Sequence, residues 1–236
     1  MQSTGLRHST YGIVTRTPHG SGVGASAAEG FVVRLNLSVR HPGTGQLVSA
    51  PTNPVIVGDT FPAMLKRSGD FLDSRCLERT DDIVWHLERF PSGLLEEVEG
   101  PSLGGAFALG IAQVLACMSE EVDAAARLEL GNVAVVAQVI RTPETPFSLA
   151  AIGNAAAKLR ELIDSAPISG LTTVVLAAGQ SVPADFSPPD SAQAWFIERE
   201  IPNGGTRYRI LVIRAHTVDE AIDALALAQT APILEL

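Results

Sequence analysis

The chain has 236 residues, of which 46% are hydrophobic and 18% charged, with a formal net charge of −9 and a mean hydropathy of +0.21. This length and apolar content suffice for one large domain or two small ones with a sizeable core. The negative charge argues against nucleic acid or an anionic membrane as the main partner. The two cysteines, Cys76 and Cys117, have neither metal-ligand nor redox spacing, so we expect thiols in a reducing, cytoplasmic compartment.

Strand patterns dominate the first ninety residues. Residues 1–10 are polar, so we expect a loose tail there and a single domain over residues 11–236. The glycine-rich piece at 20–24 lacks the Gly-Lys-Ser/Thr ending of a phosphate loop, and we interpret it as a flexible hairpin. Apolar and polar residues alternate over 31–39, as in a strand with one buried face. The other elements predicted in this part are strands at 12–15, 46–50 and 82–90, a turn at 41–45 and a helix at 59–73.

A tight turn precedes the most apolar helix of the chain. Its sequence, Glu-Gly-Pro-Ser-Leu-Gly-Gly at 99–105, leads into a helix predicted over 103–118, which is too short for a membrane span. Glycine and proline shape the backbone around Ser102, and main-chain N–H groups at the head of the helix could receive a developing oxyanion. Ser102 is therefore a candidate nucleophile. Serine is also a favoured helix N-cap, and that interpretation stays open.

A second motif, Ile-Gly-Asn-Ala-Ala-Ala-Lys-Leu at 152–159, lies in a helix predicted over 149–164. Lys158 sits on the flank of an apolar stripe formed by residues 152, 155, 156, 159, 162 and 163. A nucleophilic serine needs a base, and a lysine can serve only if burial lowers its pKa. No acid adjoins Lys158 in the sequence, which makes it a candidate base. The alternative is a lysine whose stem lies on the core while its ammonium reaches water.

The rest of the chain alternates strands and helices. The nearly all-apolar strand at 133–140 should be central in its sheet. Thr217, with Glu220 three residues later, predicts the cap of a helix over 217–227. Apparent hairpins argue against a purely parallel sheet, so we predict an α+β fold with mixed sheets and packed helices. The other predicted elements are strands at 172–177, 194–201 and 208–214 and a proline-rich loop at 180–190.

Both motifs resemble those of the Lon-type serine peptidases. The serine turn is similar to that family's Asp-Gly-Pro-Ser-Ala-Gly. Residues 152–159 are similar to its Ile-Gly-Gly-Leu-Lys-Glu-Lys-Leu, in which the second lysine matches Lys158. Weaker similarity covers 82–86, 169–176 and 218–225 in the family's order, so the resemblance runs from about Tyr11 to the end of the chain. It implies a Lon proteolytic-domain-like fold, the class of the second domain of a small-subunit ribosomal protein.

The resemblance also implies an activity, a serine endopeptidase that uses a Ser-Lys dyad and forms an acyl-enzyme. In this role Ser102 and Lys158 are catalytic, and the residues expected to position the serine and its oxyanion are Gly100, Pro101, Leu103 and Gly104. It implies a peptide or protein substrate, no metal or cofactor, and neither nucleic acid nor membrane as partner. The sequence holds no nucleotide-binding motor, so an ATPase or regulatory partner domain would deliver folded substrates. A homo-oligomer is a further possibility because family members often form rings.

Departures from the family pattern leave a second interpretation open. Leu130-Gly131-Asn132 stands where the family has Thr-Gly-Glu, whose threonine helps to hold the catalytic lysine. Thr142 or Thr145 could substitute for it. Residues 141–151 look like an insertion, and residues 153–157 depart from the family's Gly-Gly-Leu-Lys-Glu. The alternative is a catalytically degenerate Lon-like domain that acts as a peptide or protein interaction module.

Overall fold

The computed structural model describes residues 7–16, 29–53, 58–75, 80–90, 98, 101–118, 128–142, 145, 147–188, 192–200 and 207–230, with side chains from residue 32 onward. Its helices are α1 (Phe61–Arg75), α2 (Gly104–Met118), α3 (Ala155–Ser169) and α4 (Val218–Thr230). Its 3₁₀ turns are Pro101–Leu103, Leu130–Asn132 and Ala184–Phe186. Its strands are β1 (Arg7–Arg16), β2 (Glu29–Arg40), β3 (Leu47–Ser49), β4 (Asp82–Phe90), β5 (Val133–Val136), β6 (Gln138–Ile140), β7 (Ser148–Ala150), β8 (Thr173–Ala177), β9 (Ala194–Glu200) and β10 (Arg207–Ala215).

Eight of the described strands form one mixed sheet in the order β3-β4-β2-β1-β5-β8-β10-β9. The four strands β1, β5, β8 and β10 run parallel to one another. On either side of them the pairing becomes antiparallel, with β2 between β1 and β4, and β9 beside β10. β6 and β7 form a separate antiparallel pair. This arrangement confirms the predicted α+β class with mixed sheets and packed helices.

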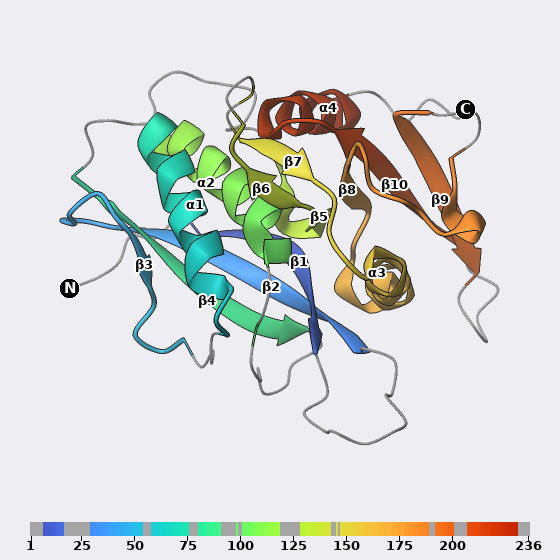
Figure 1. The fold of residues 1–236 in the computed structure, drawn as a ribbon, viewed down its shortest axis with the longest axis horizontal. Coiled ribbons are helices and arrows are strands. Elements are labelled where there is room, and N and C mark those ends of the chain that lie inside the picture. The colour runs from blue at the N-terminus through green and yellow to red at the C-terminus, as the bar shows by residue number, and fades with distance from the viewer. Residues whose placement is uncertain are drawn as a thin grey trace.

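Helices cover both faces of the sheet, with α1, α2 and α4 on one face and α3 on the other (Figure 1). Because side chains alternate along a strand, β5 contributes to two apolar clusters. Val133 and Val135 pack with α2, whereas Ala134 and Val136 pack with α3. The prediction that this strand is central in its sheet is therefore confirmed, and burial on both faces explains its continuous apolar sequence.

Several predicted elements have the expected bounds. β4 covers the predicted residues 82–90, and the prediction for α4 is also confirmed. The Glu220 N–H donates to Thr217 Oγ1 at 3.1 Å, and Glu220 Oε2 accepts from the His216 N–H at 2.7 Å. This reciprocal arrangement satisfies main-chain donors that a helix start leaves without an intrahelical partner.

Two predicted elements are each split into two elements or shortened in the structure. The predicted strand at 133–140 is interrupted at Ala137, whose carbonyl accepts a 3.1 Å hydrogen bond from the Gly105 N–H, so only β5 joins the main sheet. The helix predicted over 149–164 begins at Ala155, because residues 148–150 form β7. Phe147 and Asn154 turn the chain on either side of β7 with positive φ values of 62° and 55°. Hydrophobic periodicity contains no signal for such backbone turns.

The first strand starts earlier than predicted. β1 begins at Arg7, inside the segment 1–10 that we had assigned to a loose tail. Its backbone pairs with β2, from Arg7 opposite Ser38 to Arg16 opposite Glu29. Pairing along β2 supplies the main-chain hydrogen bonds of this polar segment, which its own composition does not reveal. The predicted hairpin at 20–24 lies outside the described residues.

The apolar segment Pro101–Met118 is long and hydrophobic enough to cross a membrane, with a mean hydropathy of 1.5. In the fold, however, 72% of it is buried among other elements. The Phe107 ring packs edge-on against Phe61 and Trp85, at centroid distances of 6.4 and 5.8 Å. α2 is therefore the central core helix of the described structure, and its first turn is held against the sheet.

Candidate functional site

Ser102 lies in the 3₁₀ turn Pro101–Leu103, directly before α2, and its residue is only 2% exposed. The proline fixes one backbone dihedral just ahead of the serine. α2 itself begins at Gly104, two residues after Ser102. The predicted geometry is therefore present: a tight turn carries a buried serine to the head of a buried helix.

Two glycines dock the start of α2 tightly against the β5–β6 junction. A Cβ added to Gly105 would lie 2.6 Å from Val135 Cγ1 and 3.1 Å from the Ala137 carbonyl oxygen. A Cβ on Gly104 would lie 3.0 Å from the Val139 nitrogen. Only glycine allows so close an approach. The glycine pair thus fixes where the serine turn sits relative to the carboxyl end of β5.

The predicted oxyanion residues can be examined in part. Gly100 lies outside the described residues. Pro101 has no N–H, so it can only shape the turn. The Gly105 N–H already donates to Ala137, which leaves the main-chain N–H groups nearer Ser102, at Leu103 and Gly104, as the candidates.

Lys158 lies in the first turn of α3, on the side that packs against the sheet. Its neighbours at helical spacing, Ala155 and Leu162, belong to the apolar cluster beneath β5 and β8, as does the adjacent Leu159. Lys158 is 5% exposed, so nearly all of its side chain is covered by the surrounding elements. None of the ion pairs between described residues involves Lys158.

Burial lowers the pKa of Lys158 from its ordinary value of 10.5 to about 8. The physical cause is desolvation, which disfavours the ammonium when no carboxylate offsets it. With such a pKa about one amine in ten is unprotonated at pH 7, against roughly one in three thousand for an exposed lysine. A lysine in this state can accept a proton near neutral pH.

Ser102 and Lys158 approach one edge of the sheet from opposite faces. The start of α2 is held at Ala137, just beyond β5, and the chain that enters α3 is held at Gln180, just beyond β8. β5 and β8 are parallel neighbours, so both helices begin at the carboxyl ends of these strands. The hydrogen bonds between described residues do not include one from Lys158 Nζ to Ser102 Oγ. The dyad therefore stays a prediction. The two side chains would have to come within hydrogen-bond distance at this edge of the sheet.

The two threonines suggested as substitutes for the family's lysine-holding residue have other partners. Thr142 Oγ1 donates to the Thr145 carbonyl at 3.1 Å and accepts from the Thr145 N–H at 3.0 Å. These bonds close the turn between β6 and β7. Within the described chain, neither threonine bonds to Lys158, and Leu130 is a buried apolar residue. The group that orients the lysine must be sought elsewhere.

No protein-family model matches the chain, and no curated protein matches its sequence. The resemblance to Lon-type peptidases therefore depends on the motifs alone and is carried forward as a proposal.

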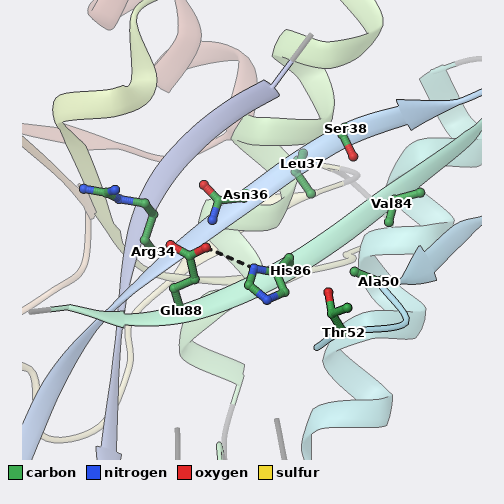
Figure 2. Close-up of a pocket in the computed structure, with 9 residues that line it drawn as sticks. All are labelled: Arg34, Asn36, Leu37, Ser38, Ala50, Thr52, Val84, His86 and Glu88. Carbon is green, nitrogen blue, oxygen red and sulfur yellow. Dashed lines mark ion pairs between the residues drawn. The ribbon is translucent and has the colours of Figure 1, made fainter. Parts of the chain in front are cut away.

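A groove of about 460 Å³ lies on the face of β2 and β4, on the side of the sheet that carries α3. Figure 2 shows its side chains in two rows, with Arg34, Asn36 and Ser38 on β2 and Val84, His86 and Glu88 on β4. His86 Nδ1 lies 3.3 Å from Glu88 Oε1. The alternation over 31–39 predicts a strand with one buried apolar face, so its other face is polar. That this polar face is concave follows from the sheet and from the chain after β3, which sequence periodicity does not report.

Potential metal ligands do not gather in the described ranges: no three His, Cys, Asp or Glu side chains lie close enough to hold an ion. Cys76 lies outside these ranges. The chemistry available at the carboxyl edge of β5 and β8 is therefore that of a hydroxyl, an amine and main-chain N–H groups.

Proposed function

We propose that this chain is a serine endopeptidase of the Lon type, with Ser102 as nucleophile and Lys158 as general base. The observation that carries the proposal is the burial of Lys158 without an ion pair among the described residues, which lowers the pKa of its amine to about 8. The position of Ser102 at the head of the core helix supports it further. Both helices begin near the carboxyl ends of β5 and β8, on opposite faces of the sheet.

In the proposed reaction Ser102 Oγ attacks the carbonyl carbon of a peptide bond while Lys158 Nζ accepts the hydroxyl proton. Main-chain N–H groups near Leu103 and Gly104 stabilise the oxyanion of the tetrahedral intermediate. When this intermediate collapses, the C–N bond breaks and Lys158 returns the proton to the leaving amine. Lys158 then takes a proton from the water whose oxygen attacks the acyl ester, and it returns this proton to Ser102 Oγ when the ester C–O bond breaks and the peptide is released.

The substrate in this proposal is an extended or unstructured segment of polypeptide, cut in the cytoplasm. A folded substrate would first need unfolding by an ATPase or regulatory partner domain, and a homo-oligomer would limit access to the site. Cleavage should rise about tenfold from pH 7 to pH 9 and then level off, because only the unprotonated amine of Lys158 acts as base.

The proposal is tested by incubating the protein with casein, an unstructured substrate, and following peptide release at pH 8.5. Ser102→Ala and Lys158→Met should both abolish cleavage and labelling by a fluorophosphonate serine probe. Ser68→Ala and Lys66→Met are matched controls, since Ser68 is another buried serine and Lys66 is the only other lysine in the sequence. Unchanged cleavage by Ser102→Ala or Lys158→Met would refute the dyad.

A second candidate function, peptide binding without catalysis, is favoured by the polar groove on β2 and β4. Its paired charges and hydrogen-bonding side chains suit an extended polypeptide laid across the sheet. If this candidate is correct, the parent protein will bind casein in an anisotropy titration without cutting it. His86→Ala will then weaken binding, whereas the exposed His216→Ala, outside the groove, will not. Cleavage by the parent protein would exclude this candidate.

A further inference from the structure

Two glutamines hold the chain where it enters α3. Gln180 is 4% exposed and lies three residues beyond the end of β8. Its Oε1 accepts from the Ile152 N–H at 2.8 Å, and its Nε2 approaches the carbonyl oxygens of Ile152 at 3.5 Å and Ser181 at 3.4 Å. Gln138, at the start of β6, donates through Nε2 to the Ala151 carbonyl at 3.0 Å. The consecutive residues Ala151 and Ile152 are thus bonded to side chains that follow the carboxyl ends of β5 and β8.

The position of Ile152 in turn fixes the position of the first turn of α3. Ile152 is buried and belongs to the apolar cluster beneath the sheet, together with Ala155 and Leu159. Between them Asn154 adopts a left-handed conformation, and its carbonyl accepts the Lys158 N–H at 3.1 Å. The depth of Lys158 against the sheet therefore depends on where Ile152 is held.

Among the described side chains around α3, no charge supplies another explanation for the state of this lysine. β5 and β8, whose side chains share an apolar cluster with α3, carry no titratable residue. α3 also packs on β2. On α3 itself, Arg160, Glu161 and Asp164 are exposed, whereas Lys158 is buried. On β2, the Arg34 guanidinium lies over the Phe90 ring at 5.3 Å.

We propose that Gln180 is the positioning residue for Lys158, assisted by Gln138, in the place of the family threonine that this chain lacks. The inference rests on the proposed function, because positioning matters for the reaction only if Lys158 is the base. The structural part of the proposal does not depend on catalysis. The amide of Gln180 holds the main chain of Ile152, and this contact keeps Lys158 in the apolar cluster beneath the sheet.

The experiment exploits the two lysines of the sequence. Protein labelled with ¹³C at lysine Cε gives one signal from Lys158 and one from the exposed Lys66, and each is titrated by NMR. In Gln180→Met, which keeps the volume but removes the hydrogen bonds, the Lys158 titration should move toward 10.5. Each rise of one pH unit in the Lys158 pKa implies about a tenfold fall in the unprotonated fraction at pH 7. The Lys66 titration should stay in place.

Gln229→Met is the matched control. Gln229 makes the same pair of main-chain bonds, accepting from the Glu129 N–H at 2.9 Å and donating to the Glu129 carbonyl at 3.0 Å, but on α4. This variant should leave the Lys158 titration unchanged. An unchanged titration in folded Gln180→Met, or an equal shift in Gln229→Met, would overturn the proposal.

A second variant and the cleavage assay remove two ambiguities from this test. If Gln180→Met does not fold, Gln138→Met is titrated instead, and it should shift Lys158 in the same direction by a smaller amount, since it removes only the tie at Ala151. An unshifted Lys158 there would also overturn the proposal. Because the NMR titration needs no cleavage, it separates failure of this inference from failure of the dyad, which Ser102→Ala tests. If both hold, the lower limb of the cleavage pH profile will move with the NMR titration.

Discussion

Asp82 and Lys158 are both charged side chains with almost no exposed surface, at 1% and 5%, but their surroundings differ in kind. Asp82 accepts from the main-chain N–H groups of Thr44 and Gln46 at 2.6 and 3.0 Å, and from Arg40 Nε at 3.1 Å. Arg40 Nη2 at 2.5 Å and the Thr44 hydroxyl at 3.2 Å bring the total to five donor contacts from three residues. Lys158, by contrast, has no ion-pair partner among the described residues.

The pKa values of the two groups reflect this difference. The Arg40 guanidinium, followed by the N–H groups of Gln46 and Thr44, holds the pKa of Asp82 well below its ordinary range, so its charged form is the stable one. Burial alone lowers the pKa of Lys158 to about 8, so a much larger fraction of its amine is neutral at pH 7 than in an exposed lysine. A buried charge surrounded by donors holds a fold together, whereas a buried amine without an acid is poised to take a proton. The comparison separates a structural group from a candidate catalytic one.

Removing the structural charge should have the largest effect on stability. Asp82→Ala leaves the Arg40 guanidinium and the Thr44 and Gln46 N–H groups without their acceptor, so the turn between β2 and β3 loosens and Tm should fall by several degrees. Because the folded-state pKa of Asp82 lies below its unfolded value of 3.8, its contribution is present above about pH 4 and lost at lower pH. Thermal melts at pH 7 and pH 3 check this.

The control for that comparison is Asp81→Ala. Asp81 is the neighbouring carboxylate and pairs with the exposed His41, so its loss should change Tm little. Equal losses from both substitutions would remove the distinction between a buried carboxylate with several donors and an ordinary surface pair.

Removing the buried amine should act in the opposite direction. Lys158→Met should stabilise the protein at pH 7, because the unfolded chain binds a proton that the folded protein disfavours. The lysine's folded pKa of about 8 lies below the ordinary 10.5, so wild-type stability rises with pH between these values. Urea unfolding should show an advantage for the variant on the order of 2 kcal/mol at pH 7 that is largely gone at pH 10. Lys66→Met should show no such pH dependence. If the stability difference between Lys158→Met and the wild type did not change with pH, the Lys158 amine would be well solvated.

A steric substitution at Gly43 tests how tightly the turn packs around Asp82. A Cβ on Gly43 would lie 2.3 Å from the Asp82 main-chain nitrogen and 2.6 Å from its Cγ, so Gly43→Ala must displace the turn from the carboxylate. We expect a loss of about 1–2 kcal/mol in the free energy of unfolding. Gly179→Ala is the control, because nothing lies within 4 Å of its added Cβ. A neutral Gly43→Ala would show that the turn adapts without losing Asp82.

Periodicity and turn chemistry predicted much of the secondary structure. The strand predicted at 82–90 matches β4, and the Thr217–Glu220 spacing predicted the hydrogen bonds at the start of α4. The apolar stripe of the lysine helix was also informative, since Ile152, Ala155 and Leu159 pack beneath the sheet. These features are local: each depends on residues within one or two turns of a helix or along one strand.

The sites where prediction was incomplete involve partners far away in the sequence. Ala137 interrupts a continuous apolar strand because the start of α2 bonds to its carbonyl, and β7 replaces the first turn of a predicted helix because β6 pairs with it. The partners of Asp82 lie between 36 and 42 residues away. Which of many possible partners is chosen depends on how the layers pack, and no local window contains that information.

By itself the sequence determined the alternation of strands and helices, the apolar faces of β5 and α3, and the two residues, Ser102 and Lys158, worth testing. Only the tertiary structure decided that Lys158 is buried and without an ion pair in the described chain, and that Gln180 holds the chain leading to it. A side chain's solvation is set by every element around it. It is therefore a property of the assembled layers, while the tendency to form a helix or a strand belongs to the segment.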